Sequence, residues 1–260
     1  MGELVRFEIE NRVATVTIDN PPMNVLSSQV TQELDETFTE LANNPAVGAV
    51  ILTANGSRAF MAGADIKEFP QKMNASKEEK LNRNAAVHDV LNKIADLQKP
   101  TIASLNGLAL GGGCELSLTC DIRIAEAHVK IGLPEVKLGL FPGGGGTQRL
   151  PRIVGPSKAK ELMFLGDPIT AEEALALGLV NKVVPSGEGL AAAQVLAEKI
   201  AAYSADALKF IKRAVNEGAD QGLEAGLDLE RQLFADVFET DNVKEGVRAF
   251  LEKRAPVFNQ

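Results

Sequence analysis

The sequence predicts an α/β fold in which parallel strands are joined by helices. Up to about residue 145, apolar strand-like runs such as 47–53 and 100–105 alternate with turns and amphipathic helical segments. This alternation is typical of parallel sheets with helical crossovers. Beyond that point the chain is rich in Ala, Leu, Glu and Lys and predicts one helix after another. We therefore expect an α/β core at residues 1–195, followed by a helical region at 196–260.

Local signals assign the individual elements. β-Branched residues indicate strands, Ser and Thr indicate helix starts, and Pro and Gly indicate where elements end. The expected strands lie at 4–18 (ending before Pro21-Pro22), 47–53, 100–105, 121–125 and 129–131. The expected helices lie at 27–43 (capped by Ser27 or Ser28), 77–97, 157–165, 170–177, 189–202, 205–217 and 221–236, with Gly166, Gly178 and Gly218 as stops.

Composition narrows the class of protein. The 260 residues can bury a large core, and contents of 45% hydrophobic and 24% charged residues are those of an ordinary globular protein. The formal net charge of -8 argues against nonspecific binding to nucleic acid. No apolar run is long enough to cross a membrane, and residues 1–6 carry no secretion or transit pattern. Cys114 and Cys120 lie in an apolar stretch and are expected to be buried thiols. We therefore expect a cytoplasmic protein with no membrane or nucleic-acid partner.

The most informative segment is Asn106–Leu116, where the glycines at 111–113 separate two apolar runs and lead to Glu115. A carboxylate in apolar surroundings loses hydration, so it needs a partner, a raised pKa or a chemical role. If a helix begins at Gly112, its free N–H groups suit a developing anion. Glu115, three residues on, then lies on the same face of that helix. The segment predicts an anion-binding amide and an acid–base carboxylate at one point.

A second carboxylate and further glycine loops accompany this segment. Pro134 places Glu135 near a helix start, where the carboxylate has the alternative of only capping amides. The small residues of Ala62–Lys67 leave amides open, which alone is a weak signal. The four glycines at 143–146 are expected to form a flexible turn, with Thr147 as the cap of the next helix.

Other chemistries lack their sequence patterns. There is no phosphate-binding Gly-x-x-x-x-Gly-Lys-Ser/Thr, no His-Glu-x-x-His, no Cys-x-x-Cys and no Gly-x-Ser-x-Gly. The glycines at 111–113 lack the spacing of a dinucleotide fingerprint. His88 and His128, the only histidines, are expected to be surface or packing residues. No metal or redox cofactor is therefore expected.

In combination, these motifs resemble the enoyl-CoA hydratase (crotonase) family. The resemblance lies in Phe60–Glu68, Asn106–Asp121, Pro134-Glu135 and Pro142–Leu150, with less specific signatures at Asn20–Ser27 and Gly246–Arg254. These segments follow the family's order and span essentially the whole chain. The resemblance implies a spiral of ββα units, C-terminal helices that mediate trimer assembly, and a thioester of coenzyme A (CoA) as substrate.

The resemblance also implies roles for individual residues. The N–H groups of Ala64 and Gly112 match the oxyanion hole that binds the thioester oxygen. CoA contacts are implied for Ala62, Ala64, Asp65, Ile66, Lys67 and Gly112, and for Lys253, which matches a lysine that reaches a neighbouring subunit's ligand; Arg58 is a further candidate cation. CoA arrives as part of the substrate, so no separate cofactor is implied.

Glu115 and Glu135 match both glutamates of the true hydratases, whereas isomerase-like members usually keep one. Adding water needs a base to activate the water and an acid to protonate the α-carbon. We expect Glu115 mainly to activate the water and Glu135 mainly to supply the proton. Met61 and Leu133 depart from the residues common in the family, and we expect both to affect the shape of the acyl pocket.

The favoured function is an enoyl-CoA hydratase that interconverts trans-2-enoyl-CoA and 3-hydroxyacyl-CoA, in fatty-acid β-oxidation or a related acyl-CoA pathway. Alternatives with the same fold are an enoyl-CoA isomerase and a branched-chain hydratase of methylglutaconyl-CoA type. An alternative of another class is a non-catalytic CoA-binding or RNA-associated protein. The intact glutamate pair and the acidic net charge count against that class. The family resemblance further implies a homotrimer or a hexamer built as a dimer of trimers.

Overall fold

The computed structural model describes the chain from Gly2 to Asn259. Its elements are β1 (Val5–Glu10), β2 (Val13–Ile18), α1 (Ser28–Asn43), β3 (Ala49–Ala54), β4 (Ala59–Ala62), η1 (Ile66–Glu68), α2 (Phe69–Asn74), α3 (Lys77–Ala95), β5 (Thr101–Leu105), β6 (Leu108–Leu110), α4 (Gly112–Ser117), β7 (Ile122–Glu126), β8 (Lys130–Gly132), η2 (Pro134–Leu138), α5 (Gly146–Val154), α6 (Pro156–Leu165), β9 (Ile169–Thr170), α7 (Ala171–Ala176), β10 (Lys182–Val184), α8 (Gly189–Ala201), α9 (Ala205–Ala219), α10 (Leu223–Val237) and α11 (Asp241–Leu251).

The strands form two sheets, with strand orders β1-β2-β3-β5-β7-β10 and β4-β6-β8-β9. Successive turns of the chain add one strand to each sheet: β3 is followed by β4, β5 by β6, and β7 by β8. Within each sheet these successive strands are parallel neighbours. The chain therefore winds as a spiral, which confirms the expected α/β architecture. The carboxyl ends of β4, β6 and β8 lead into the segments that carry the candidate site.

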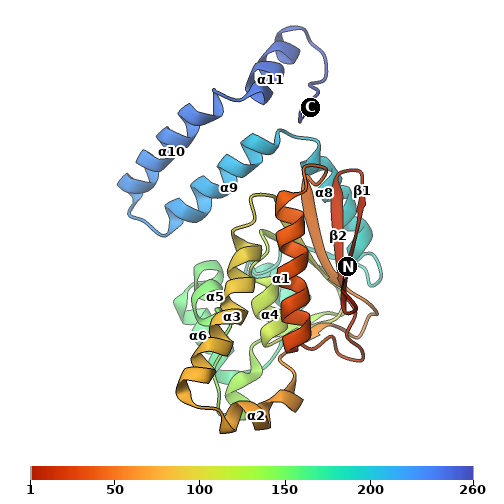
Figure 1. The fold of residues 1–260 in the computed structure, drawn as a ribbon, viewed down its shortest axis with the longest axis vertical. Helices are drawn as coiled ribbons and strands as arrows, with labels where there is room; N and C mark the ends of the chain where they lie inside the picture. Colours follow the sequence, from red (N-terminus) through yellow and green to blue (C-terminus); the bar gives the residue numbers. More distant parts are fainter. Residues whose placement is uncertain (1, 260) are drawn as a thin grey trace.

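Helices cover both faces of the larger sheet (Figure 1). Helices α1 and α3 lie side by side over one face, and α8 packs against the other. Strand β3 contributes side chains to the packing on both faces of the sheet, because successive side chains of a strand point to opposite faces. Val50 and Leu52 join the core under α1 and α3, whereas Ala49 and Ile51 join the core under α8. This explains why the run is apolar throughout.

Helix α8 fixes where the α/β core ends. Its buried residues Ala193, Ala197 and Ala201 recur every four positions and pack against the sheet. The predicted boundary after residue 195 falls inside this helix, so packing moves the end of the core to residue 201. The helices that leave the body begin with α9.

Helices α9, α10 and α11 project from the body as an arm (Figure 1). Gly218 lies inside α9, and a β-carbon built at Gly226 would lie 3.3 Å from the Gly218 carbonyl oxygen. Helix α9 therefore ends at Ala219, one residue beyond the predicted stop, and Gly218 also allows α9 and α10 to approach closely. Gly166 and Gly178 do follow helix ends with positive φ of 62° and 72°, as predicted.

Two further expectations concern the cysteines and membrane-spanning helices. Cys114 and Cys120 are both buried free thiols, as predicted. Within residues 2–259, no helix combines the length and apolar character needed to cross a bilayer.

Candidate active site

The loop after β4 presents a free backbone amide at Ala64. Leu26 pairs with this loop: its N–H donates to the Gly63 carbonyl (2.8 Å) and its carbonyl accepts from the Asp65 N–H (3.1 Å). Pairing on both sides of Ala64 fixes the loop but uses neither of that residue's own backbone groups. Within the described residues, the Ala64 N–H has no hydrogen-bond acceptor.

Asn24 supports this loop from below. Its buried side-chain amide donates to the carbonyls of Asn55 (3.1 Å) and Ala59 (2.7 Å), and its side-chain oxygen accepts from the Asn20 N–H (2.9 Å). The segment that looked like an N-terminal family signature therefore has a structural purpose, because it holds β4 and the Ala64 amide in place.

Gly112 presents a second free amide beside the first. It begins α4, so its N–H has no partner inside the helix. A β-carbon built at Gly112 would lie 3.8 Å from the Ala64 nitrogen, so the two amide groups adjoin. A β-carbon at Gly113 would lie only 2.0 Å from the Met61 carbonyl oxygen, so only glycine permits α4 to lie against β4. The predicted pair of amides is thus brought together.

Glu115 lies on α4 and is buried, with 4% of its surface exposed. Its Oε1 accepts two hydrogen bonds from the loop before α5, from the N–H groups of Gly144 (2.7 Å) and Gly146 (2.8 Å). Burial raises the pKa of Glu115, while these two amides and the nearby side chains of His88 and Arg149 oppose the rise. The amides favour the ionised form, because a carboxylate accepts hydrogen bonds more strongly than a carboxylic acid does.

Glu135 follows Pro134 in the 3-10 helix η2, as the sequence predicted. The amide that acts on its carboxyl group is its own backbone N–H, which opposes a rise in the pKa of Glu135, while its Oε2 is buried and has no hydrogen-bond partner within the described residues. Burial, with a smaller contribution from the negative charge of Glu115, raises the pKa of Glu135 to about 7. A carboxyl group in this state is readily protonated near neutral pH and is suited to donate a proton.

A cavity of about 660 Å³ joins these groups. It is bounded by the start of α1, by η1 and α2, by α3, and by η2 with the loop after it. Its lining includes these predicted site residues: Ala62, Ala64, Ile66, Gly112, Glu115 and Glu135. Both carboxyl groups and both free amides therefore face one mostly apolar cavity, which is the usual form of a small-molecule site.

The comparisons with known proteins agree with this geometry. The sequence profile described as enoyl-CoA hydratase/isomerase matches residues 8–260. The short-chain-enoyl-CoA hydratase of Clostridium acetobutylicum is 43% identical over 251 residues, covering 96% of this chain and 95% of the relative. The crotonyl-CoA hydratase of Syntrophomonas wolfei is 42% identical over 257 residues, covering 98% of each. The crystal structure of an enoyl-CoA hydratase from Bacillus anthracis superimposes with a TM-score of 0.93 at 37% identity, covering 99% of both chains.

The chain belongs to the enoyl-CoA hydratase/isomerase family. Relatives named as hydratases match over nearly the full length, so the activity is that of an enoyl-CoA hydratase, a lyase acting on acyl-CoA thioesters.

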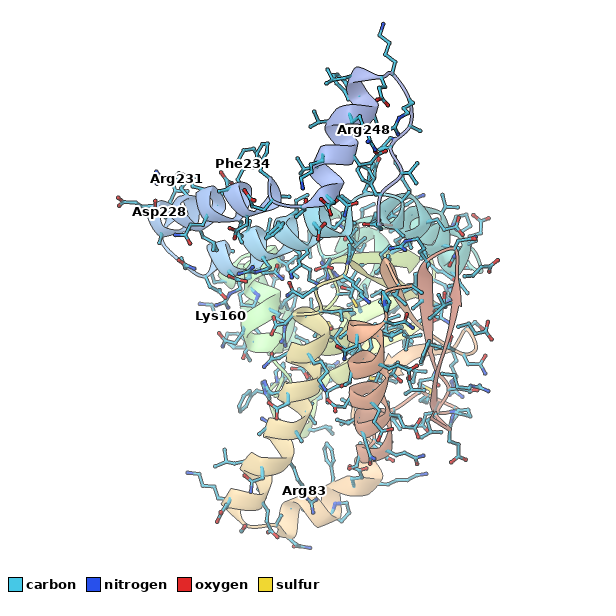
Figure 2. All side chains as sticks on the ribbon, turned by 45° about the horizontal axis from the view of Figure 1, so that its top comes forward. Arg83, Lys160, Asp228, Arg231, Phe234 and Arg248 are labelled. Atoms are coloured by element: carbon cyan, nitrogen blue, oxygen red, sulfur yellow. The ribbon has the colours of Figure 1, made fainter. Side chains whose placement is uncertain are left out.

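The other residues implied in CoA binding are absent from the described lining of the cavity. Asp65 caps η1 by accepting from the Lys67 N–H (2.9 Å), and neither residue lines the cavity. Lys253 follows α11 on the arm with a φ of 55°, outside the cavity of its own chain. Figure 2 shows the separation, with Arg83 at the α2–α3 end near the cavity and Arg248 of α11 at the opposite end of the molecule.

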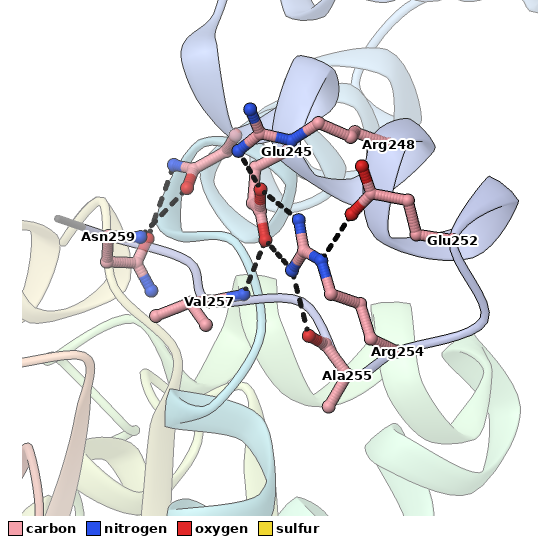
Figure 3. A network of polar contacts seen from close by, with 8 residues as sticks. Glu245, Arg248, Glu252, Arg254, Ala255, Val257 and Asn259 are labelled. Atoms are coloured by element: carbon pink, nitrogen blue, oxygen red, sulfur yellow. Dashed lines mark hydrogen bonds and ion pairs between the residues drawn. The ribbon is translucent and has the colours of Figure 1, made fainter.

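A network of ion pairs fixes the chain next to Lys253 (Figure 3). The Arg254 guanidinium pairs with Glu245 (2.6 Å) and with Glu252 (2.6 Å). Further along, the Asn259 side chain accepts from the Ala205 N–H at 2.8 Å. The end of the chain is therefore folded back onto the start of the arm, and it holds Lys253 in a defined place.

Met61 and Leu133 do not shape the cavity wall as expected. Both are fully buried and neither is among the lining residues. Met61 lies behind Gly113, and a β-carbon at Gly146 would lie 3.1 Å from Leu133 Cδ1. They pack behind the site in this family member, and the lining side chains of the wall come from other residues, such as Val87 and Phe141.

Sequence reasoning missed the partners of Glu115. The loop of 143–146 is not a bland flexible turn capped by Thr147: α5 begins at Gly146 after Gly145, which has a φ of 103°, and Thr147 does not cap it. His88 is half-buried and packs against this loop with its Nε2 2.7 Å from the Gly143 carbonyl oxygen, a specific contact that the sequence did not predict. One sequence signal points to this contact between α3 and the loop: polar residues recur every four positions along α3.

Proposed function

We propose that the enzyme hydrates short-chain trans-2-enoyl-CoA thioesters to 3-hydroxyacyl-CoA by reversible syn addition. The observation that carries the proposal is the meeting of Glu115, Glu135 and the Ala64 and Gly112 amides around one cavity. The printed names of the relatives support the short-chain preference, since they specify short-chain-enoyl-CoA and crotonyl-CoA as what those proteins act on.

The two amides serve as the oxyanion hole. When water adds to the β-carbon, negative charge moves to the thioester oxygen and an enolate forms. The Ala64 and Gly112 N–H groups, which have no acceptor among residues 2–259, donate to that oxygen. Fixed amides need no reorganisation as the charge develops, and one such donor is typically worth ~3–4 kcal/mol in the transition state.

The two carboxyl groups divide the proton chemistry. Glu115, held as a carboxylate by two amides, takes a proton from the water as its oxygen bonds to the β-carbon. Glu135, whose pKa of about 7 leaves much of it protonated at neutral pH, gives its proton to the α-carbon. One proton is taken up and one is released, so the sum is the addition of one water to the double bond.

The CoA portion binds along the mouth of the cavity. Ala62, Asp65 and Ile66 offer backbone contacts, and Lys67 and Arg58 offer cations for the phosphates. Lys253 lies on the projecting arm and serves the cavity of a neighbouring subunit. That role requires an oligomer, and we propose a homotrimer or a hexamer formed as a dimer of trimers, working in the cytoplasm in fatty-acid β-oxidation or a related acyl-CoA pathway.

A spectrophotometric assay with purified protein tests the proposal. Crotonyl-CoA should be consumed with loss of the enoyl-thioester absorbance, and mass spectrometry should show 3-hydroxybutyryl-CoA. A series of longer and branched enoyl-CoA thioesters then sets the acyl preference. Conversion of a 3-enoyl-CoA without hydration of crotonyl-CoA would instead indicate an isomerase, and a preference for methylglutaconyl-CoA the branched-chain hydratase. Binding of CoA with no turnover of any thioester would indicate the non-catalytic alternative.

A further inference from the structure

One face of α3 follows the glycine loop of 143–146 along its length. Asn84, His88 and Asn92 are spaced four residues apart, so they lie on the same face of the helix. A β-carbon at Gly143 would lie 3.9 Å from Asn84 Oδ1, which places this polar face beside the loop. His88 is half-buried and the two asparagines are exposed, so this polar face lies at the side of α3 and not in the core, which Val90, Leu91 and Ile94 join.

Two side chains donate hydrogen bonds to carbonyl groups of the loop. The His88 Nε2 is 2.7 Å from the Gly143 oxygen, and because a carbonyl only accepts, the imidazole donates. The Arg149 Nη1 donates to the Gly144 oxygen (3.1 Å). The Arg149 Nη2 donates to Asn92 Oδ1 (2.6 Å), which holds the guanidinium in place against α3.

The same loop donates hydrogen bonds from its amides to Glu115. Gly144 and Gly146 point their N–H groups at Glu115 Oε1, while the Gly144 carbonyl points the other way, at Arg149. A β-carbon at Gly145 would lie 2.2 Å from Arg149 Nη1, so the guanidinium lies directly against bare backbone. A continuous chain of contacts therefore runs from α3 through Arg149 and the loop to the carboxylate.

We propose that His88, Asn92 and Arg149 are positioning residues, which hold the glycine loop so that its amides orient the Glu115 carboxylate toward the reacting water. None of the three lines the cavity within the described residues, so each acts through the loop and not on the thioester. The inference rests on the proposed hydratase function, because it assigns these residues to the orientation of the base.

Glycine makes this support necessary. Four consecutive glycines have more conformational freedom than any other run of residues, and that freedom opposes a fixed arrangement of amides. Hydrogen bonds to two of the loop carbonyls restrict it. Without them the amides move and Glu115 loses both its orientation and the donors that favour its ionised form. A displacement of about 1 Å in a reacting group can cost ~100-fold in rate.

The experiment compares variants of the full-length enzyme. Arg149→Met removes the guanidinium at similar length, and Arg149→Lys keeps the charge but not the forked geometry. Asn92→Leu leaves Arg149 present but unanchored, and His88→Gln keeps an N–H donor that His88→Leu lacks. Arg152→Gln is the matched control, since Arg152 lies on the same helix, is exposed and pairs with Asp220 on the arm (3.2 Å). The readouts are kcat and KM with crotonyl-CoA, Kd for butyryl-CoA, which cannot be hydrated, and Tm.

We expect kcat to fall ~100-fold in Arg149→Met and less in Arg149→Lys and Asn92→Leu. We expect His88→Leu to fall further than His88→Gln. KM and the Kd of butyryl-CoA should change less than about twofold, because the oxyanion hole and the CoA contacts are untouched. The control should match the wild type.

The possible results separate cleanly. Loss of butyryl-CoA binding in parallel with kcat would show a merely structural role and overturn the inference. If Arg149→Met does not fold, the Asn92→Leu variant and the two His88 variants decide by the same criteria. A wild type that hydrates crotonyl-CoA, with all of these variants as active as Arg152→Gln, removes the positioning role alone. A wild type that hydrates no enoyl-CoA removes the proposed function and this inference with it.

Discussion

The Glu115 carboxylate occupies the space into which a side chain at Gly144 would project. A β-carbon there would lie 2.6 Å from Glu115 Oε2, while the Gly144 N–H donates to Oε1. Position 144 therefore requires glycine, because any larger side chain would displace the Glu115 carboxylate that the Gly144 N–H orients.

Gly144→Ala should therefore disable the enzyme without unfolding it. Its φ is not in the left-handed region, so the backbone tolerates alanine. The added methyl group meets the Glu115 carboxylate first, at 2.6 Å, and the end of the Leu91 side chain at 3.1 Å. We expect kcat for crotonyl-CoA to fall ~100-fold or more, in line with the cost of misplacing a reacting group. Gly222→Ala, at a glycine with nothing within 4 Å of its built β-carbon, is the control. Near-normal turnover in Gly144→Ala would show that Glu115 does not need this orientation.

Replacing the proposed acid should affect turnover and spare binding. Glu135→Gln keeps the shape of the side chain but has no proton to give to the α-carbon. General acid catalysis contributes about 10²- to 10⁴-fold, so kcat should fall within that range while the Kd of butyryl-CoA stays nearly constant. Steady-state kinetics with crotonyl-CoA and titration calorimetry measure the two quantities. An unchanged kcat would assign the α-proton to another group.

The pH profile of kcat/KM should be bell-shaped. Glu135 has a pKa of about 7 and must be protonated, so the rate falls on the alkaline side as pH rises through that value. Glu115 must be ionised, so the rate falls on the acid side as pH drops below its raised pKa. The carboxyls interact, so the two limbs belong to the pair. In Glu135→Gln the alkaline limb should disappear from the residual activity; its persistence at the same pH would point to a different acid.

Stability should depend on Asn24, which lies outside the cavity. Asn24→Ala leaves the Ala59 and Asn55 carbonyls and the Asn20 N–H without this partner. Leaving a buried polar group unsatisfied costs about 1–3 kcal/mol, and alanine also fits poorly at a φ of 50°. Denaturant unfolding should show a loss of at least this size. Equal stability of wild type and variant would mean that water replaces the amide fully.

What the sequence could predict was local. Glu115 and Glu135 could be predicted because each follows, within a few residues, the Gly or Pro that positions it. The strands and most helices could be predicted for the same reason, since their periodicity is contained in a short window. For example, the sequence predicted Ser27 or Ser28 as the cap of α1, and Ser27 is the one that caps it.

What the sequence could not predict joins distant residues. Asn92 and Arg149 are 57 positions apart and meet only because α3 and α5 both border the glycine loop. Gly218 carries the same kind of local signal as Gly166, yet it lacks the positive φ of Gly166 and lies against Gly226 of α10, one residue before α9 ends. Thr147 was a reasonable cap by composition. The left-handed Gly145 took that position because the loop must turn its amides toward Glu115.

The arm should complete the CoA site of a neighbouring subunit. Phe250 and Leu251 are 82% and 74% exposed at the end of α11, beside Lys253. Phe250→Asp should release smaller species in analytical ultracentrifugation, since a charge cannot be buried cheaply in an apolar contact. Lys253→Ala should keep the assembly and raise KM only about two- to fivefold with unchanged kcat, the scale of one exposed ion pair with a phosphate. Phe250→Asp should raise KM at least as much, because disassembly removes Lys253 from its neighbour's ligand. If the wild type is a monomer and its KM still depends on Lys253, then Lys253 does not act on the ligand of a neighbouring subunit.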